Sequence, residues 1–241
     1  MYEKGRYLMS GDKGLIVEFG NEISEPVNKK VRNLYLAVQK SQIEGICEMI
    51  PTYRSLLIQY NPLEIEVNSL MERLAEIEES LDSIELPKPR IIEIPTIYGG
   101  EFGEDLKFVS EHNGISEEEV IRIHSSVDYR IYMLGFSPGF PYLGGMSEKI
   151  ETPRLKTPRT KIPGGSVGIA GKQTGIYPME SPGGWQLIGR TPIKLYDPKS
   201  EVPIILQAGD YLRFVPIEKE EYDSISSLAE KNQYEIKIVT E

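Results

Sequence analysis

The stretch that decides the fold runs from residue 133 to residue 192 and contains three motifs rich in glycine and proline. They read MLGFSPGFPYLGG (133–145), TPRLKTPRTKIPGGSVGIAGKQTGIYP (152–178) and MESPGGWQLIGRTP (179–192). Glycine opens backbone angles that other residues avoid and proline fixes φ, so a run this dense in both specifies the path of a loop. Bulky rings, in which disordered tethers are poor, are spread through the stretch at Phe136, Phe140, Tyr142, Tyr177 and Trp185. We therefore expect a folded surface built mainly from loops.

The sequence on either side of this stretch predicts a small β-barrel or sandwich. A strand over 128–134 leads into it, and two helices precede that strand: 105–113, closed by Gly114, and 117–125, opened by a Ser-x-x-Glu capping box. Short apolar runs between turn signals follow at 167–170, 185–189, 193–196, 204–206 and 211–215. Many short strands joined by glycine-rich turns are typical of sandwiches and barrels. A last helix is expected over 220–232.

The first part of the chain alternates between strand and helix patterns. Apolar residues recur every three or four positions over 27–38 and again over 70–84, as amphipathic helices require. Extended apolar runs are found at 7–10, 15–19, 43–50, 55–60 and 90–95. The order β-α-β-β-α-β is typical of an antiparallel sheet with both helices on one face. We therefore predict an α+β protein, with an N-terminal sandwich domain over 1–95 and a β-barrel domain over 96–241.

Composition limits the classes of partner. The chain has 241 residues, with 27 Lys and Arg against 37 Asp and Glu, and a formal net charge of −10. This charge disfavours attraction to nucleic acid or to an anionic membrane, so a protein or a small molecule is the expected partner. The single cysteine, Cys47, allows no intrachain disulfide, and neither a signal peptide nor a membrane span is indicated. We therefore expect a cytoplasmic protein.

Nucleotide-binding motifs are incomplete in this sequence. Gly171-Lys172 fails the phosphate-loop pattern, which needs a glycine at Ser166 and a hydroxyl residue at Gln173. The dinucleotide fingerprint fails as well, because its glycines would here be spaced by three throughout. We interpret these glycines, Gly165, Gly168 and Gly171, as sites of tight turning within a barrel.

Histidine, cysteine and serine offer little chemistry. His112 and His124 fall in the two predicted helices, where a surface role or a satisfied core role is favoured over that of a base. One Cys and two His cannot build a zinc site without several carboxylates, so no metal is predicted. Ser137 in GFSPG resembles a nucleophile elbow, but the following prolines oppose a helix and no histidine lies downstream. A hydrogen bond within the turn is its expected role.

Three cations lie on a segment stiffened by proline. Arg154 and Arg159 each follow Thr-Pro, and Lys161 comes shortly after them. The planar fork of arginine suits carboxylate or phosphate, so we predict an anion-binding edge; pairing with the abundant Asp and Glu is the equal alternative. Trp185 is expected to be a core ring or, less favoured, a stacking platform. The full set of candidate substrate-binding residues is Arg154, Arg159, Lys161, Tyr142, Gln173, Tyr177 and Trp185.

A family resemblance rests on long motifs. GFSPGFPYLGG, TPRLKTPRTKIPGGSVGIAG, QTGIYPMESPGGWQLIGRTP and LQAGDYLRFVPI resemble the KipI family, also called allophanate hydrolase subunit 1 or the 5-oxoprolinase PxpB family. The resemblance extends from GDKGLIVEFG at 11–20 to about residue 217. It implies an N-terminal α+β domain and a C-terminal cyclophilin-like β-barrel. It also implies a complex with a KipA (PxpC)-type and a LamB/YcsF (PxpA)-type subunit, which opens 5-oxoproline to glutamate with ATP.

The resemblance leaves two other functions open. One is inhibition of a sensor histidine kinase, as one relative of this family does. The other is the carboxyltransferase part of a biotin-dependent urea carboxylase or allophanate hydrolase system. All three functions would use the same loops. We favour a non-autonomous 5-oxoprolinase subunit, with ATP bound by the complex, no metal in this chain and no catalytic residue assigned.

Overall fold

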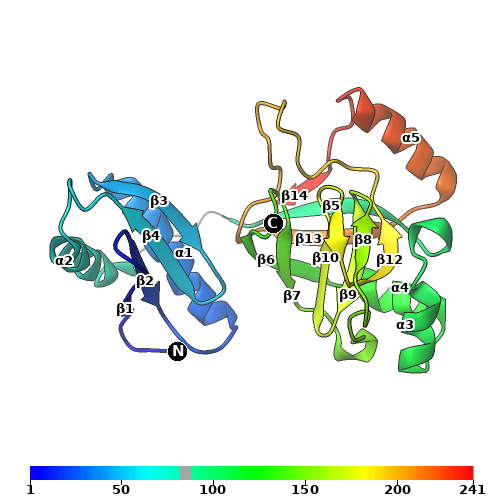
Figure 1. Cartoon of the computed structure of the whole chain (residues 1–241). Helices are drawn as coiled ribbons and strands as arrows, with labels where there is room; N and C mark the ends of the chain where they lie inside the picture. Colours follow the sequence, from blue (N-terminus) through cyan, green and yellow to red (C-terminus); the bar gives the residue numbers. More distant parts are fainter. Residues whose placement is uncertain (82–87, 241) are drawn as a thin grey trace. The chain divides into compact units, whose positions relative to one another are not determined.

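The computed structural model describes residues 1–81 and 88–240, which fall into two compact units, Met1–Pro87 and Lys88–Glu241 (Figure 1). Each unit has its own hydrophobic core. Within the described residues, no helix combines the length and the apolar character needed to cross a membrane.

The N-terminal unit is a four-stranded antiparallel sheet with two helices packed on it. The strands lie in the order β1-β2-β4-β3. Their bounds are β1 (Arg6–Met9), β2 (Gly14–Glu18), β3 (Ile46–Pro51) and β4 (Ser55–Tyr60), and those of the helices are α1 (Glu25–Ser41) and α2 (Val67–Glu78). Each of these elements is expected from the sequence, with ends that differ by a few residues.

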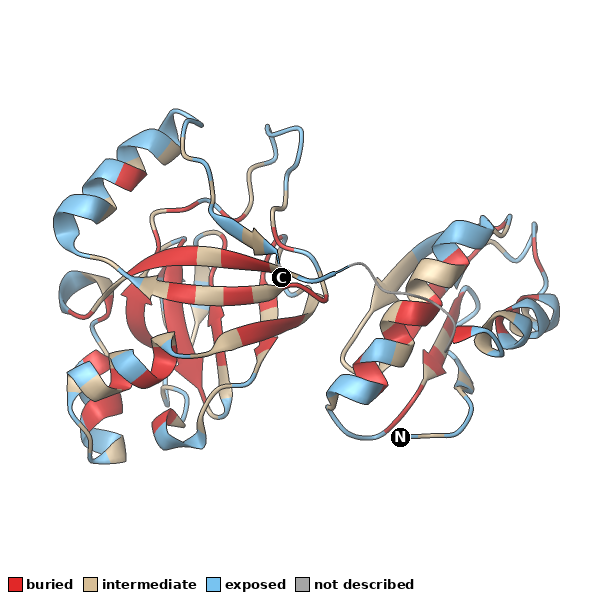
Figure 2. Ribbon diagram, turned by 180° about the vertical axis from the view of Figure 1, so that it is seen from behind, coloured by how far each residue is buried: buried red, intermediate tan, exposed pale blue. Residues whose placement is uncertain are grey.

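Helix α1 shows why the pattern predicts this unit. Pro26 stands in its first turn, where a missing N–H is harmless, and Gln42 ends it in the left-handed conformation. The predicted stripe is buried against the sheet, as Figure 2 shows for α1: Val27, Val31, Leu34 and Val38. In α2, Leu70 and Leu74 are fully buried, while residue 84, expected to extend the same stripe, lies outside the described residues.

The assignment of 90–95 to the N-terminal sheet is wrong. These residues belong to β5 (Arg90–Tyr98), which pairs in parallel with β13 (Tyr211–Pro216) in the second unit. The pattern of a short apolar strand identifies the element, but its partner is 120 positions away, as the Ile91–Tyr211 pair shows. The expected domain boundary after residue 95 falls inside β5, so we propose a boundary before this strand.

The second unit is a nearly closed β-barrel. Seven strands lie in the order β10-β9-β12-β5-β13-β6-β7, and the end strands β7 and β10 lie side by side. The additional bounds are β6 (Asp128–Leu134), β7 (Pro141–Gly144), β9 (Ser166–Ala170), β10 (Gln173–Ile176), β12 (Gln186–Arg190) and β14 (Ile238–Thr240), which pairs with β5. The structure confirms the expected α+β architecture with a C-terminal barrel.

The helices of the second unit also match the sequence. Helix α3 (Leu106–Asn113) ends at Gly114 in the left-handed conformation, and α5 (Lys219–Glu230) is the expected last helix. The runs 193–196 and 204–206 are not strands and share only one isolated bridge, between Tyr196 and Ile204. Pro192 and Pro203 precede the two runs, and each removes an N–H that a ladder would need.

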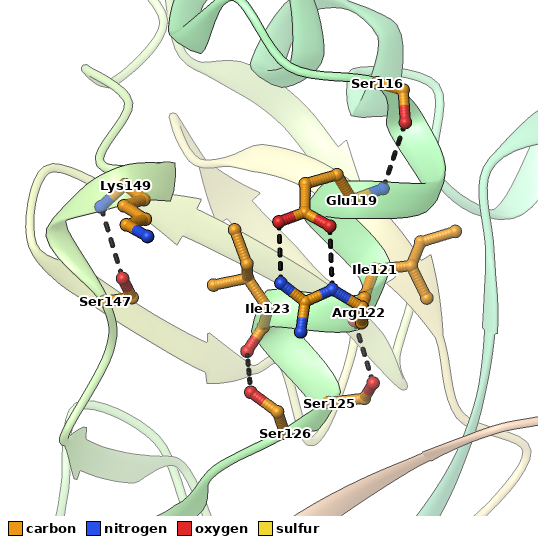
Figure 3. A network of polar contacts seen from close by, with 9 residues as sticks. All are labelled: Ser116, Glu119, Ile121, Arg122, Ile123, Ser125, Ser126, Ser147 and Lys149. Atoms are coloured by element: carbon orange, nitrogen blue, oxygen red, sulfur yellow. Dashed lines mark hydrogen bonds and ion pairs between the residues drawn. The ribbon is translucent and has the colours of Figure 1, made fainter.

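Helix α4 (Glu117–Ser125) is fixed by polar contacts along its exposed side (Figure 3). The Ser116 hydroxyl accepts the backbone N–H of Glu119 at 3.2 Å, which confirms the first half of the capping box. The Glu119 carboxylate in turn pairs with Arg122 one turn later at 2.7 Å. The other side of α4 is buried, and Val120 and His124 there are fully enclosed in the barrel core.

Candidate functional site

An aromatic cluster lies where the chain enters β7 and leaves β10. We define it as Phe140, Tyr142, Tyr177 and Trp185. Phe140 is its centre, with ring centroids 5.4 Å from Tyr142, 5.9 Å from Tyr177 and 5.7 Å from Trp185. All three pairs are edge-to-face, the arrangement that ring quadrupoles favour. The structure thus brings together three of the predicted site residues through a fourth ring.

Glycines make room for this cluster. Gly168 of β9 and Gly175 of β10 lie directly opposite each other. A Cβ added at Gly175 would lie 3.2 Å from the Trp185 ring, and one added at Gly183 would collide with the Tyr177 hydroxyl. The glycines of these motifs therefore leave the space that the aromatic rings fill.

Three of the four rings in the cluster are core residues. Phe140, Tyr177 and Trp185 are only 3%, 2% and 9% exposed. Burial raises the pKa of Tyr177, opposed by a hydrogen bond with the Trp185 backbone and by the charges of Arg154 and Arg159. The structure therefore favours the core role of Trp185 over that of a stacking platform.

A strap, residues 152–162, crosses beside this cluster. Its start is pinned to the barrel, because the Pro153 carbonyl accepts the Gln186 side-chain amide at 2.8 Å and Leu155 N–H donates to the Gly184 carbonyl at 2.7 Å. Its end is strand β8 (Arg159–Ile162), which pairs with the short strand β11 (Ser181–Gly183). Arg154 thus has a hydrogen-bonded backbone group on each side.

Arg159 is engaged within the protein. Its Nη2 contacts both carboxylate oxygens of Asp105, at 2.8 and 2.9 Å, and its Nε lies 3.0 Å from a carboxylate oxygen of Glu104. Its Nη1 donates to the Trp185 carbonyl at 3.2 Å. With all three guanidinium nitrogens engaged, these contacts favour the ion-pair alternative for Arg159.

The other two cations differ from Arg159. Lys161 pairs with Glu180 at 2.9 Å, and both side chains are largely exposed. Arg154 is exposed and forms no ion pair with any acid in the described part of the chain. In a chain of charge −10, a cation held on a pinned segment without an acidic neighbour is available to an external anion.

Tyr142 is the least buried ring of the cluster, and Phe136 adds an exposed ring beside it. Tyr142 on β7 and Gln173 on β10 are half-buried. Phe136 is 70% exposed, has φ of 59° and sets its ring 5.4 Å from that of Phe140. A left-handed phenylalanine is uncommon, and such backbone strain tends to occur at functional sites. Phe136 and Tyr142 are therefore the accessible rings of the candidate site, and Arg154 is the exposed cation of the neighbouring strap, whereas Gln173 lies at the end of β10 away from Tyr177.

Ser137 and the histidines do not form a nucleophile pair. The expected turn is present, because Ser137 N–H donates to the Gly135 carbonyl and Phe140 N–H donates to that of Ser137. The Ser137 hydroxyl is buried and has no partner among the described residues, so the hydrogen bonds that Ser137 makes within the turn come from its backbone and not, as expected, from its side chain. His112 is exposed on α3, whereas His124 bonds Tyr98 and Thr174 in the core. This confirms the surface and core roles expected for the histidines.

The Gly171-Lys172 turn is poorly suited to a polyphosphate. The turn at Gly171 carries Lys172, whose ammonium lies 2.7 Å from Glu148 and 4.0 Å from Glu151. Two carboxylates at that turn oppose a polyphosphate. Within residues 1–81 and 88–240, no group of three or more His, Cys, Asp or Glu could hold a metal ion. Gly165 and Gly171 have positive φ at either end of β9, in the turns predicted for them. The prediction of a turn at Gly168 is wrong, because this residue lies inside β9 and pairs with Gly175.

Sequence reasoning missed two residues that shape the site, Asp105 and Gln186. Asp105 follows the pattern of a residue preceding a helix, since it stands just before α3, but nothing in the sequence indicates its partner Arg159. Gln186 is 2% exposed and stands in an apolar run that is typical of a strand. A glutamine inside such a run is a signal that the sequence does offer. Its amide is expected to be buried, and a buried polar group needs a hydrogen-bond partner.

Comparison with known proteins gives consistent matches. The chain matches the family described as carboxyltransferase domain, subdomain C and D, over residues 5–206. It is 46% identical over 226 residues to the 5-oxoprolinase B subunit of Bacillus subtilis (strain 168), covering 88% of this chain and 92% of that protein. It is 41% identical over 215 residues to the 5-oxoprolinase B subunit of Escherichia coli O157:H7, covering 89% and 97%.

Two solved structures share the fold. The crystal structure of TTHA0988 superposes with a TM-score of 0.76 at 37% identity, covering 86% of this chain and 40% of that one. The Kluyveromyces lactis urea carboxylase superposes with a TM-score of 0.79 at 24% identity, covering 98% of this chain and 24% of that one. This chain therefore spans less than half of either protein.

Proposed function

The chain belongs to the carboxyltransferase domain family, subdomains C and D, and from this membership we propose that it is a non-autonomous subunit of a cytoplasmic 5-oxoprolinase. In the proposed reaction, the complex opens 5-oxo-L-proline to L-glutamate with ATP. The proposal is carried by the identity of 46% and 41% to the B subunits of two 5-oxoprolinases, over nearly their whole length. Such a subunit implies further subunits, so the chain is part of an enzyme complex.

We propose a KipA (PxpC)-type and a LamB/YcsF (PxpA)-type chain as the partners. The match to TTHA0988 supports a partner chain, because this chain covers only 40% of that protein and the remaining part would correspond to another subunit. ATP is proposed to bind outside this chain, since Glu148 and Glu151 surround the lysine of the Gly171-Lys172 turn. The chain's own contribution is then recognition of substrate or partner by the surface around Arg154.

The alternatives receive less support. The urea amidolyase of Lachancea kluyveri is 28% identical, and this chain covers 14% of it, which supports shared ancestry of the domain and not a biotin-dependent reaction. No feature of the described residues favours inhibition of a sensor histidine kinase. The experiments below therefore test the 5-oxoprolinase function.

The isolated chain is expected to release no glutamate from 5-oxoproline, because no nucleotide or nucleophile site is recognised among residues 1–81 and 88–240. Adding the two proposed partner subunits and ATP should restore release. The measurement is glutamate formed by the chain alone, by the partners alone and by the mixture. Turnover by the chain alone, or no gain on adding it to its partners, would contradict the proposed role.

Arg154→Lys is expected to lower kcat/KM of the assembled complex about tenfold or more, because lysine keeps the charge but loses the fork of a charged hydrogen bond worth about 1.5–3 kcal/mol. The melting temperature should stay near that of the wild type, since Arg154 has no internal ion pair to lose. Lys156→Gln is the control, as it removes an exposed charge from the same strap. Equal kinetics for wild type and Arg154→Lys would remove Arg154 from the site.

A further inference from the structure

Arg159, the second arginine of the Thr-Pro-Arg repeat, has a different role from Arg154. The contacts of Asp105 show this role. Asp105 belongs to the barrel side of the structure: its N–H donates to the Leu187 carbonyl at 2.9 Å, and its carboxylate accepts the Leu187 N–H at 2.6 Å. Its position is therefore set by β12 and does not depend on the strap. The same carboxylate receives Arg159, which the strap carries.

This ion pair is stronger than a surface pair. The side chains of Arg159 and Asp105 are 23% and 13% exposed, and both carboxylate oxygens contact one guanidinium nitrogen. Partial burial reduces solvent screening, and each hydrogen bond is between charged groups. Glu104 adds a second, more exposed acid at 58%. The two acids together bind one arginine and attach the end of the strap to the barrel. We call these contacts of Arg159 with Asp105 and Glu104 the latch.

The latch has a direct effect on the aromatic cluster. The same guanidinium donates to the Trp185 carbonyl, and the Trp185 ring packs edge-to-face against that of Tyr177, with centroids 6.0 Å apart. Gly183, two residues before Trp185, pairs with Arg159 across the β8–β11 ladder. Releasing Arg159 would remove the side-chain contacts that tie the strap end to Asp105, Glu104 and the Trp185 carbonyl, and would leave the short β8–β11 ladder to hold it.

We infer that Asp105 is a positioning residue, which acts through Arg159 and the strap to hold Arg154 where an external anion can reach it. The inference rests on the proposed function, in which that anion is the carboxylate of 5-oxoproline. Arg154 is five positions from the latch, and its other anchors are the hydrogen bonds of Pro153 and Leu155. A strap pinned at both ends fixes the Arg154 backbone before binding, which lowers the entropy lost when the ligand is held.

The first experiment tests the latch in the isolated chain. Asp105→Asn is compared with Glu111→Gln, which removes an exposed acid from α3, the helix that Asp105 precedes. Arg159 and Lys161 lie in the β8–β11 ladder, so trypsin cleavage after them requires the strap end to open and should be about tenfold faster in Asp105→Asn. Acrylamide should also quench Trp185 more strongly. Cleavage and quenching equal to those of Glu111→Gln would overturn the latch.

Arg159→Gln releases the latch from the other side and leaves the bonds between Asp105 and Leu187 in place. It should reproduce both the faster cleavage and the stronger quenching. If Asp105→Asn does not fold, Arg159→Gln decides alone, because α3 keeps its contacts with β12. A strap that stays closed in a folded Arg159→Gln would overturn the inference.

The second experiment separates positioning from simple loss of stability. In the assembled complex, Asp105→Asn should raise KM for 5-oxoproline about fivefold with kcat within about twofold of wild type. In the Arg154→Lys background, the same change should have no further effect on KM, because Asp105 acts through Arg154. Additive effects would overturn the positioning role. A wild-type complex without 5-oxoprolinase activity would overturn the proposed function, while the trypsin result would still judge the latch.

Discussion

Lowering the pH from 6.5 to 5 is expected to destabilise the barrel by about 2 kcal/mol through one buried side chain, His124. Burial lowers the pKa of His124 from 6.5 to about 3. The unfolded chain therefore binds a proton below pH 6.5, whereas the folded chain binds it only near pH 3. The contribution is fully present above pH 6.5 and is lost as the pH falls, at up to about 1.4 kcal/mol per pH unit.

The surroundings of His124 explain why it stays neutral. The Thr174 hydroxyl donates to the Gly168 carbonyl at 3.0 Å, so it accepts a hydrogen from His124 Nε2 at 2.8 Å. We therefore assign the proton to Nε2, and Nδ1 accepts the Tyr98 hydroxyl at 2.8 Å. The Phe214 ring lies 4.4 Å away. Both ring nitrogens are satisfied, and no described carboxylate bonds the ring to stabilise a second proton.

The measurement is the free energy of unfolding by urea at pH 5, 5.5, 6, 6.5 and 7.5 for three proteins. The wild type should lose stability steadily below pH 6.5. His124→Gln keeps a donor and an acceptor in place but does not titrate, so its profile should be flat by comparison. His112→Gln, at the exposed histidine, is the control and should follow the wild type. An equal acid dependence in His124→Gln would assign the proton uptake to other groups.

Gly165→Ala is expected to destabilise the barrel by about 3 kcal/mol or more. Gly165 has φ of +82°, where an L side chain is strained by about 1–2 kcal/mol. Its added Cβ would also collide with the carbonyl oxygen of Thr191. That carbonyl cannot withdraw easily, since Thr191 N–H donates to Gly165 O at 2.9 Å and Gly165 N–H donates to Tyr177 O at 2.7 Å.

Gly171→Ala separates strain from collision. Gly171 also has positive φ, +58°, but nothing lies within 4 Å of the added Cβ. Its alanine variant should therefore lose only about 1 kcal/mol in urea unfolding at neutral pH. Equal losses in the two variants would show that the approach to Thr191 has no weight and that backbone strain alone acts at both glycines.

Local patterns predict elements well because their causes are local. The stripe from Val27 to Val38, the capping box at Ser116 and the glycine cap at Gly114 each depend on neighbours within a turn or two. The family resemblance, in turn, predicts the barrel that short strands alone leave undecided between barrel and sandwich. Strand partners are different: the pattern of β5 identifies a strand but assigns it to the wrong sheet.

The candidate site shows the same limit at the level of side chains. Thr-Pro-Arg occurs twice in the strap, and nothing in that repeat distinguishes Arg154 from Arg159. The distinction comes from Asp105, which the fold brings to Arg159 across 54 positions of sequence. The positive charge and the stiff backbone of the strap could be predicted from the sequence. Which of the two guanidinium groups pairs with an acid of the same chain could not, because that depends on tertiary contacts.

The position of β5 has a consequence for how the chain folds during synthesis. The N-terminal sheet joins strands that are all contained in the first 60 residues, so it can form early on the ribosome. The barrel begins with β5 but pairs that strand with β13 and with β14, which ends at Thr240. Only the end of β5, at Ile97 and Tyr98, can pair earlier, with β12, so most of its backbone groups must wait until residues 211–216 and 238–240 have emerged. The nascent chain will carry a folded N-terminal unit while the apolar β5 remains open to chaperones and to other edges.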